Sequence, residues 1–235
     1  CPSCGERDSI RFLGLQVASL ASVAINTLFG SEHLEDNERK LLAFTDSVQD
    51  ASHRASFFAG RTHRFNLRTR MAEIINGRGN VTLDDLGDEL HANADTAHAR
   101  FAVVPPDLQR DAYVRSVWSD TPDPYGIELL RQRLGFEADI EFGLRARVGR
   151  TLELSRVAVG TVDIDDFDEV VGLVAEDLRR LDGNIAPDAV ARTEEYVRGL
   201  LERLRLNGGI VNPLLQPYLE EAGRQWLIWG GRPLG

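Results

Sequence analysis

The sequence predicts a mainly α-helical protein with one short β-segment, and three observations support this fold class. The 235 residues are 43% hydrophobic and 27% charged, a balance typical of a globular chain with a buried core rather than a disordered one. Apolar residues recur at close to helical spacing in most segments of the chain. Residues 40–45 instead form a short apolar run bounded by charges, which is typical of a buried strand.

A helix is expected on each side of this strand. From Phe12 to Phe29 the apolar residues follow nearly helical spacing, and Gly30 ends the pattern. After the strand, Asp46 and Ser47 can cap a long helix that continues to about residue 75. The glycines of residues 77–80 then break it.

Glycine and proline delimit the helices expected in the rest of the chain. In order, these are 83–93 with Thr82 and Asp85 as a variant capping box, 105 to about 118, 125 to about 154 with a hinge near Gly135 or Gly143, 165–181, 187 to just before 208, and one that starts at 212. The helix of 165–181 is amphipathic. The single strand needs a partner, expected near 156–159 or 227–229, or outside this chain.

Charge and composition exclude several classes of protein. The formal net charge is −10, so the chain as a whole repels polyanions and any nucleic-acid contact must be local. Lys40 is the only lysine and has no glycine-rich turn beside it, which excludes a phosphate-binding P-loop and thus an ordinary P-loop ATPase. No secretory signal or apolar run of membrane-spanning length is present. A cytoplasmic protein without a membrane partner is expected.

Both cysteines lie at the start of the chain, in Cys1-Pro2-Ser3-Cys4-Gly5. This spacing is typical of half of a zinc knuckle, in which two thiolates bind one Zn²⁺. A redox pair and two inert thiols are the alternatives. A structural zinc needs four ligands, and no second pair follows, so we expect the other ligands upstream of Cys1 and the chain to be a fragment.

A basic face is expected on the long helix. Arg54, Arg61, Arg64 and Arg68 are separated by seven, three and four residues, and no acidic residue occurs from 51 to 72. This spacing places them along one helix face. They indicate a local nucleic-acid-binding surface. The alternative is a solvated arginine face, or one paired with the acidic run of residues 163–169.

Two segments resemble large bacterial DEAD/DEAH-box helicases of superfamily 2. Residues 40–52 are similar to the family's LLAFSDSRQDAA segment (motif IV), which opens the second RecA-like domain and commonly follows a cysteine knuckle. Residues 228–235 resemble an IWGGRP-G stretch further along those proteins. The resemblance implies that Thr45, Ser47 and Gln49 lie near the bound strand or the interdomain cleft. Val48 stands where the family usually has arginine, and the DEAD/DEAH box and the Q-x-x-G-R-x-x-R motif are absent.

The resemblance therefore implies an internal piece of an ATP-driven nucleic-acid translocase that is inactive alone. ATP and Mg²⁺ would belong to the whole enzyme, whose remaining polypeptide would be a partner together with nucleic acid. The expected parts are a half knuckle and linker helix (1–30), the start of the second RecA-like domain (31–77), a helical insertion or accessory domain (78–225) and a tryptophan- and glycine-containing segment (226–235). The alternative function is a helical protein–protein interaction module without a nucleic-acid role.

Overall fold

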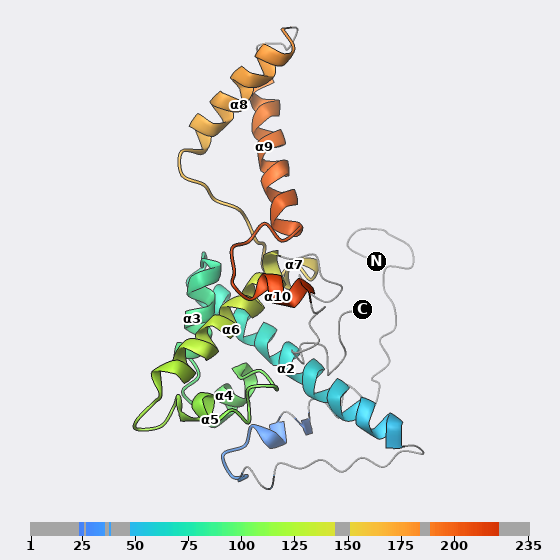
Figure 1. Ribbon diagram of the computed structural model, residues 1–235, viewed down its shortest axis with the longest axis vertical. Helices are drawn as coiled ribbons and strands as arrows, with labels where there is room; N and C mark the ends of the chain where they lie inside the picture. The colour runs from blue at the N-terminus through green and yellow to red at the C-terminus, as the bar shows by residue number, and fades with distance from the viewer. Residues whose placement is uncertain are drawn as a thin grey trace. The chain divides into compact units, whose positions relative to one another are not determined.

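The computed structural model describes residues 24–25, 27–35, 38, 48–143, 151–183 and 189–220. The helices with complete bounds (Figure 1) are α2 (Val48–Arg78), α3 (Leu83–Ala92), α4 (Ala97–Val103), α5 (Ala112–Ser116), α6 (Pro124–Gly143), α7 (Thr151–Leu154), α8 (Phe167–Leu181), α9 (Ala189–Leu206) and α10 (Leu215–Glu220). Residues 24–25 and 27–29 are helical as well. The described residues include no extended strand. The mainly α prediction is therefore confirmed.

The predicted β-segment has a different outcome for each of its parts. Residues 40–45, and the proposed partner at 227–229, lie outside the described residues. The other proposed partner, residues 156–159, is wrong, because this stretch forms a turn and a bend after α7. Arg156 has a positive φ of 57° there, which lies outside the range of regular β-strands.

Two units divide the chain, and each is assembled from separate stretches of sequence. The first contains the described residues within Cys1–Arg70, Leu90–Leu130 and Pro217–Gly235, and the second those within Met71–Glu89 and Arg131–Gln216. Such interleaving is not visible as a shift of composition along the chain. The consecutive domains expected from the sequence stay a prediction.

Local capping explains where α2 ends and α3 begins. Gly79 has a φ of +81°, which glycine adopts without the steric cost that a Cβ imposes. Its N–H donates to the carbonyl of Ile75 at 2.8 Å. Thr82 Oγ1 accepts the N–H of Asp85 at 3.1 Å, so Thr82 caps α3 as predicted and forms one half of the expected capping box.

The helix expected from residue 105 to about 118 is much shorter in the structure. Residues 105–111 form turns, and α5 begins only after Asp111. The carboxylate of Asp111 accepts the N–H groups of Tyr113 and Val114 at 2.9 and 3.0 Å, which is a helix cap. A second cap, Thr96, begins helix α4, which the sequence pattern had not indicated.

Helix α6 runs without a break through Gly135, so a hinge at that position is wrong. The helix ends at Gly143, the other position considered. A Cβ on Gly87 of α3 would lie 2.8 Å from the backbone N and Cα of Gly135. The absence of a side chain on Gly87 therefore lets the backbones of α3 and α6 approach each other within the second unit, whereas a Cβ on Gly135 would meet nothing within 4 Å.

Each unit has its own apolar core. Buried side chains of the first unit include Leu67, Leu90, Ala99, Val103, Val114 and Leu130. Trp118 packs beside them, with its ring 5.9 Å from that of His91 and the guanidinium of Arg100 5.5 Å from its centroid. Buried side chains of the second unit include Met71, Leu86, Leu134, Phe136, Ile140 and Leu152.

Helices α8 and α9 pack against each other as a hairpin within the second unit (Figure 1). Val171 and Ala175 are buried on α8, and Thr193 and Val197 on α9. Each pair is four residues apart and so lies on one helix face. The predicted amphipathic helix of residues 165–181 is confirmed, with its first residue at Phe167.

Candidate functional site

The residues predicted to bind nucleic acid or zinc fall into three groups. Four lie outside the described residues: Cys1, Cys4, Thr45 and Ser47. Three lie in α2 where the backbone is described but the side chains are not: Gln49, Arg54 and Arg61. Side chains are described for the remaining two, Arg64 and Arg68.

These two arginines differ in their exposure. Arg64 is only 8% exposed, whereas Arg68 is half-buried. Thr62, His63 and Asn66, from the same turns of α2, are also buried, so this stretch of the helix is covered. Of the predicted basic face, Arg68 is thus the member with a described side chain that reaches solvent.

The structure also bears on metal and membrane binding within the residues it describes. These residues include no group of three His, Cys, Asp or Glu side chains arranged to hold a metal ion. None of their helices is both long enough and apolar enough to cross a bilayer.

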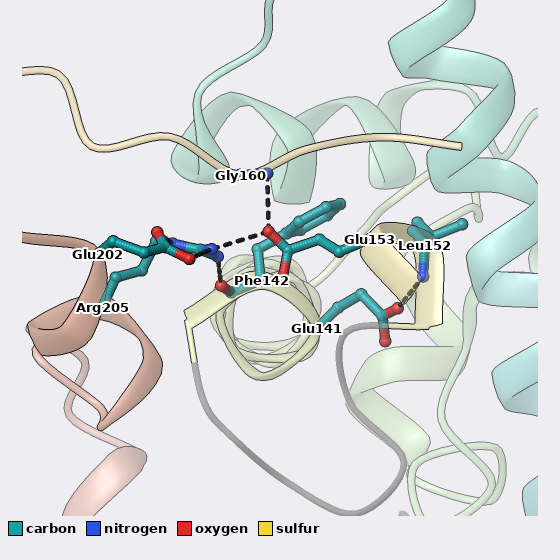
Figure 2. Close-up of polar contacts among 7 residues, drawn as sticks. All are labelled: Glu141, Phe142, Leu152, Glu153, Gly160, Glu202 and Arg205. Carbon is teal, nitrogen blue, oxygen red and sulfur yellow. Dashed lines mark hydrogen bonds and ion pairs between the residues drawn. The ribbon is translucent and has the colours of Figure 1, made fainter. Parts of the chain in front are cut away.

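A cluster of polar contacts surrounds Arg205 near the end of α9 (Figure 2). Its Nη2 donates to Glu153 Oε1 at 2.8 Å and to Glu202 Oε1 at 2.6 Å, and its Nε donates to Glu202 Oε2 at 2.8 Å. Its Nη1 donates to the main-chain carbonyl of Phe142. We call Arg205, Glu153, Glu202 and the main chain of Phe142 and Gly160 the Arg205 cluster.

The end of α6 explains why a guanidinium lies here. The last carbonyls of a helix have no partner within the helix and carry a partial negative charge. Arg205 supplies a donor to the carbonyl of Phe142, one residue before α6 ends. Burial lowers the pKa of Arg205, but the hydrogen bonds and charges of Glu202 and Glu153 outweigh it and leave the pKa above its ordinary value. The arginine is charged.

The loop after α7 closes over the same cluster. The N–H of Gly160 donates to Glu153 Oε1 at 2.9 Å, so this carboxylate oxygen accepts from both the loop and Arg205. A Cβ on Gly160 would lie 2.6 Å from Arg205 Nη1, and only glycine fits without a shift. Nearby, Glu141 Oε1 accepts the N–H of Leu152 at 2.9 Å and ties α6 to the start of α7.

The chemistry of the Arg205 cluster is that of a structural clamp. Two carboxylates and a carbonyl engage the guanidinium, and Arg205 and Glu153 side chains are only 6% and 8% exposed. The sequence analysis missed the cluster because Glu153 and Arg205 are far apart in the chain. One signal was available, since Arg205 lies eight residues after Val197 and so falls on the buried face of α9.

A second polar contact fixes the segment before α10. Asn212 Nδ2 donates to Asp139 Oδ2 at 2.6 Å, and Asn212 Oδ1 accepts the N–H of Leu214 at 2.9 Å. Burial raises the pKa of Asp139 to about 6, the hydrogen bond from Asn212 opposes this rise, and the charge of Asp84 adds to it. Asp139 therefore titrates close to neutral pH within the second unit.

Comparison of the chain with known proteins finds no matching family model, no matching curated protein and no matching solved structure. The resemblance to superfamily 2 helicases is accordingly carried by residues 40–52 and 228–235, together with the cysteine pair Cys1 and Cys4 that precedes them. Of these, only residues 48–52 fall within the described part of the chain.

Proposed function

We propose that the chain is part of a superfamily 2 helicase-like protein, to which it contributes the start of the second RecA-like domain and a helical accessory domain. The observation that carries the proposal is the motif-like segment of residues 40–52, which continues into the long helix α2. A strand followed directly by a helix is how an α/β motor domain presents polar groups at the end of a strand. The 235 residues contain no P-loop, DEAD/DEAH box or arginine-finger motif, so ATP turnover belongs to the whole motor.

In this proposal the nucleic acid contacts the N-terminal part of α2. Thr45, Ser47 and Gln49 lie near the bound strand, while Arg54, Arg61 and Arg68 contact phosphates. Free N–H groups in the first turn of a helix favour the same anions. Arg64 is left out of the contact set because it is buried and its substitution would disturb the packing of α2.

Salt-dependent binding tests this proposal. Fluorescence anisotropy of labelled single- and double-stranded DNA and RNA, at about 50 and 200 mM salt, should show weak binding that falls steeply with salt. The triple variant Arg54→Gln, Arg61→Gln, Arg68→Gln should abolish it. The matched control Arg110→Gln, Arg179→Gln, Arg192→Gln removes the same charge from exposed arginines elsewhere and should retain binding. Equal loss of binding in both variants would show that binding depends on net charge and not on the predicted basic face.

The zinc expectation remains a proposal of the same kind. Cys1 and Cys4 would supply two thiolates of a tetrahedral site, and the described residues offer no cluster that completes it. The remaining ligands would therefore come from residues beyond those described. Zinc measured by elemental analysis of the longer protein to which we propose the chain belongs, before and after substitution of both cysteines by serine, tests the site. Zinc content that is unchanged by the substitution would refute it.

A second candidate function is a helical protein–protein interaction module. The observation that favours it is the exposure of large apolar side chains on the α8–α9 hairpin, where Leu173, Leu181 and Tyr196 are all more than half exposed. Exposed apolar groups that cluster on one element are typical of a docking surface. Sedimentation velocity with candidate partner proteins and with nucleic acids separates this function from the first. A shift in sedimentation with proteins, and none with nucleic acids, would favour the interaction module.

A further inference from the structure

The end of α9 carries an asparagine that is followed by glycine. The sequence contains two such pairs, Asn76-Gly77 and Asn207-Gly208. In an Asn-Gly pair the side-chain amide can react with the next main-chain nitrogen, because glycine has no Cβ to hinder the approach. The first pair lies within helix α2. Asn207 follows Leu206, the last residue of α9, and is exposed to solvent.

Main-chain hydrogen bonds hold this helix end closed. Gly208 has a φ of +82°, and its N–H donates to the carbonyl of Arg205 at 3.2 Å. The N–H of Gly209 donates to the carbonyl of Leu204 at 2.8 Å. This pair of bonds around a left-handed glycine is the Schellman motif, which satisfies the last carbonyls of a helix. The nitrogen of Gly208 is thus part of the helix end.

Both groups of the Asn-Gly pair are engaged in the closed helix end. Asn207 Nδ2 donates to the carbonyl of Arg203, one turn back along α9, at 2.5 Å. The N–H of Gly208 is held by the carbonyl of Arg205. A reaction between them requires the nitrogen to lose its proton and to approach Cγ of Asn207, so both hydrogen bonds must break first. The helix end must therefore open locally before Asn207 can react.

The Arg205 cluster opposes this opening. Arg205 supplies the carbonyl that holds Gly208, and its own guanidinium is held by Glu153, Glu202 and the Phe142 carbonyl. The side chain of Arg205 is only 6% exposed. Local opening becomes rarer as it has to break more contacts. Fixing this side chain therefore also keeps the reactive nitrogen in place.

We propose that Asn207 is a site of spontaneous deamidation in the folded protein and that the Arg205 cluster sets its rate. After losing its proton to solvent, the Gly208 nitrogen forms a bond to Cγ of Asn207, and the bond between Cγ and Nδ2 breaks. Nδ2 leaves as ammonia with a proton from solvent, and a five-membered succinimide ring remains. Water then opens the ring at one of its two carbonyls, which gives aspartate or isoaspartate. No oxidant or other co-reactant is needed.

Either product disfavours the closed helix end. A carboxylate at position 207 has no donor for the Arg203 carbonyl, and its negative charge lies at the negative end of the helix dipole. Isoaspartate also adds a carbon to the main chain before Gly208, which displaces the N–H groups of the Schellman motif from their carbonyls. Deamidation therefore weakens the anchorage of Arg205, and refolding does not restore the amide. This inference depends on neither nucleic-acid binding nor protein docking.

Ageing of the intact chain at mildly alkaline pH tests the proposal. Trypsin cleaves after arginine and lysine and releases residues 206–224, whose other asparagine, Asn212, precedes a proline that has no N–H. This peptide therefore reports Asn207, while residues 71–78 report Asn76 in the same digest. Mass spectrometry measures conversion of amide to acid, and chromatography separates isoaspartate. Asn207 should convert in the native chain, and at least about tenfold faster in guanidinium chloride.

Two substitutions of Arg205 test the control by the cluster. Arg205→Met removes every donor and should raise the rate at Asn207 at least about tenfold in native buffer. Arg205→Lys keeps the charge but loses the planar fork, and it should raise the rate by a smaller factor. Asn76 should keep its native rate in both variants, which separates opening of the helix end from unfolding of the whole unit. Circular dichroism must show native helicity.

Two control variants leave the cluster intact. Arg198→Met removes an exposed arginine from the same helix, and Gly87→Ala disturbs the packing of α3 on α6 in the same unit. Neither should change the rate at Asn207. Retention of the Asn207 amide in the native chain, after the unfolded chain has converted, would overturn the site. A rate unaffected by both Arg205 variants, or raised equally by Gly87→Ala, would overturn the control by the Arg205 cluster.

Discussion

Removing the guanidinium from the Arg205 cluster should destabilise the second unit severely. The substitution Arg205→Met keeps most of the side-chain volume but takes away every donor. Glu153, whose side chain is only 8% exposed, then loses the guanidinium that donates to it, and the Phe142 carbonyl loses the donor shown in Figure 2. Removal of one partner from a buried ion pair costs about 3–5 kcal/mol. That is a large part of the 5–15 kcal/mol by which a typical domain is stable.

The matched control is Arg198→Met on the same helix. Arg198 and Glu194 side chains are 60% and 48% exposed, and an exposed pair contributes only about 0–1 kcal/mol. Urea unfolding followed by circular dichroism, analysed with a common m value, should separate the two variants by at least about 2 kcal/mol.

A double variant sharpens the same test. If the loss comes from the stranded carboxylate, Arg205→Met with Glu153→Leu should be more stable than Arg205→Met alone, because replacing both buried charges by apolar groups is often neutral. The reasoning is refuted if Arg205→Met is no more destabilising than Arg198→Met, or if the double variant only adds the two losses.

Three further predictions concern the packing, the titration and the capping of the helices. Gly87→Ala should destabilise the chain by about 1–3 kcal/mol, since its Cβ would overlap the backbone of Gly135. Gly135→Ala should instead stabilise α6 by about 0.5–1 kcal/mol, because nothing lies within 4 Å of the added Cβ. Thermal unfolding of both variants checks this contrast. Burial raises the pKa of Asp139 from 3.8 to about 6, so the folded state binds the proton more strongly than the unfolded state. The resulting contribution to stability is present below pH 3.8 and is lost as the pH rises through about 6. Carboxyl NMR should show that midpoint, and Asp139→Asn should remove this component from the dependence of the unfolding free energy on pH. Asp111→Ala removes the cap of α5 and should cost about 1 kcal/mol in denaturant unfolding; an unchanged midpoint would mean that the cap adds nothing.

Local signals in the sequence predicted the helices whose limits depend on local chemistry. The capping threonine before α3 and the apolar periodicity of α8 belong to single segments, and both were predicted correctly. Gly135 illustrates the opposite case. Along the sequence it resembles a hinge, but α6 continues through it, and α3 packs against this stretch of α6 at Gly87, a tertiary contact that no local pattern contains. The prediction of a helix starting at Pro105 was wrong because Asp111 caps the helix that forms, so α5 begins only at Ala112.

The candidate sites were predictable to different degrees. Spacing alone placed Arg64 and Arg68 on one face of α2, but the burial of Arg64 depends on tertiary packing that the spacing does not contain. The Arg205 cluster joins α6, α7 and α9 and so depends entirely on tertiary contacts. At the end of α9, by contrast, the pair Asn207-Gly208 was readable from the sequence, and only the hydrogen bonds that hold it required the structure.

The order in which the second unit folds follows from the same guanidinium. Arg205 and Phe142 are 63 residues apart, whereas the α8–α9 hairpin forms between helices that are neighbours in sequence. Contacts between distant residues form late, because closing a long loop costs chain entropy before the contacts that offset this cost can form. The hairpin should therefore be in place before the clamp closes. Loss of Arg205 should accelerate unfolding and leave the folding rate nearly unchanged, so the clamp governs how long the native hairpin persists rather than how fast it forms.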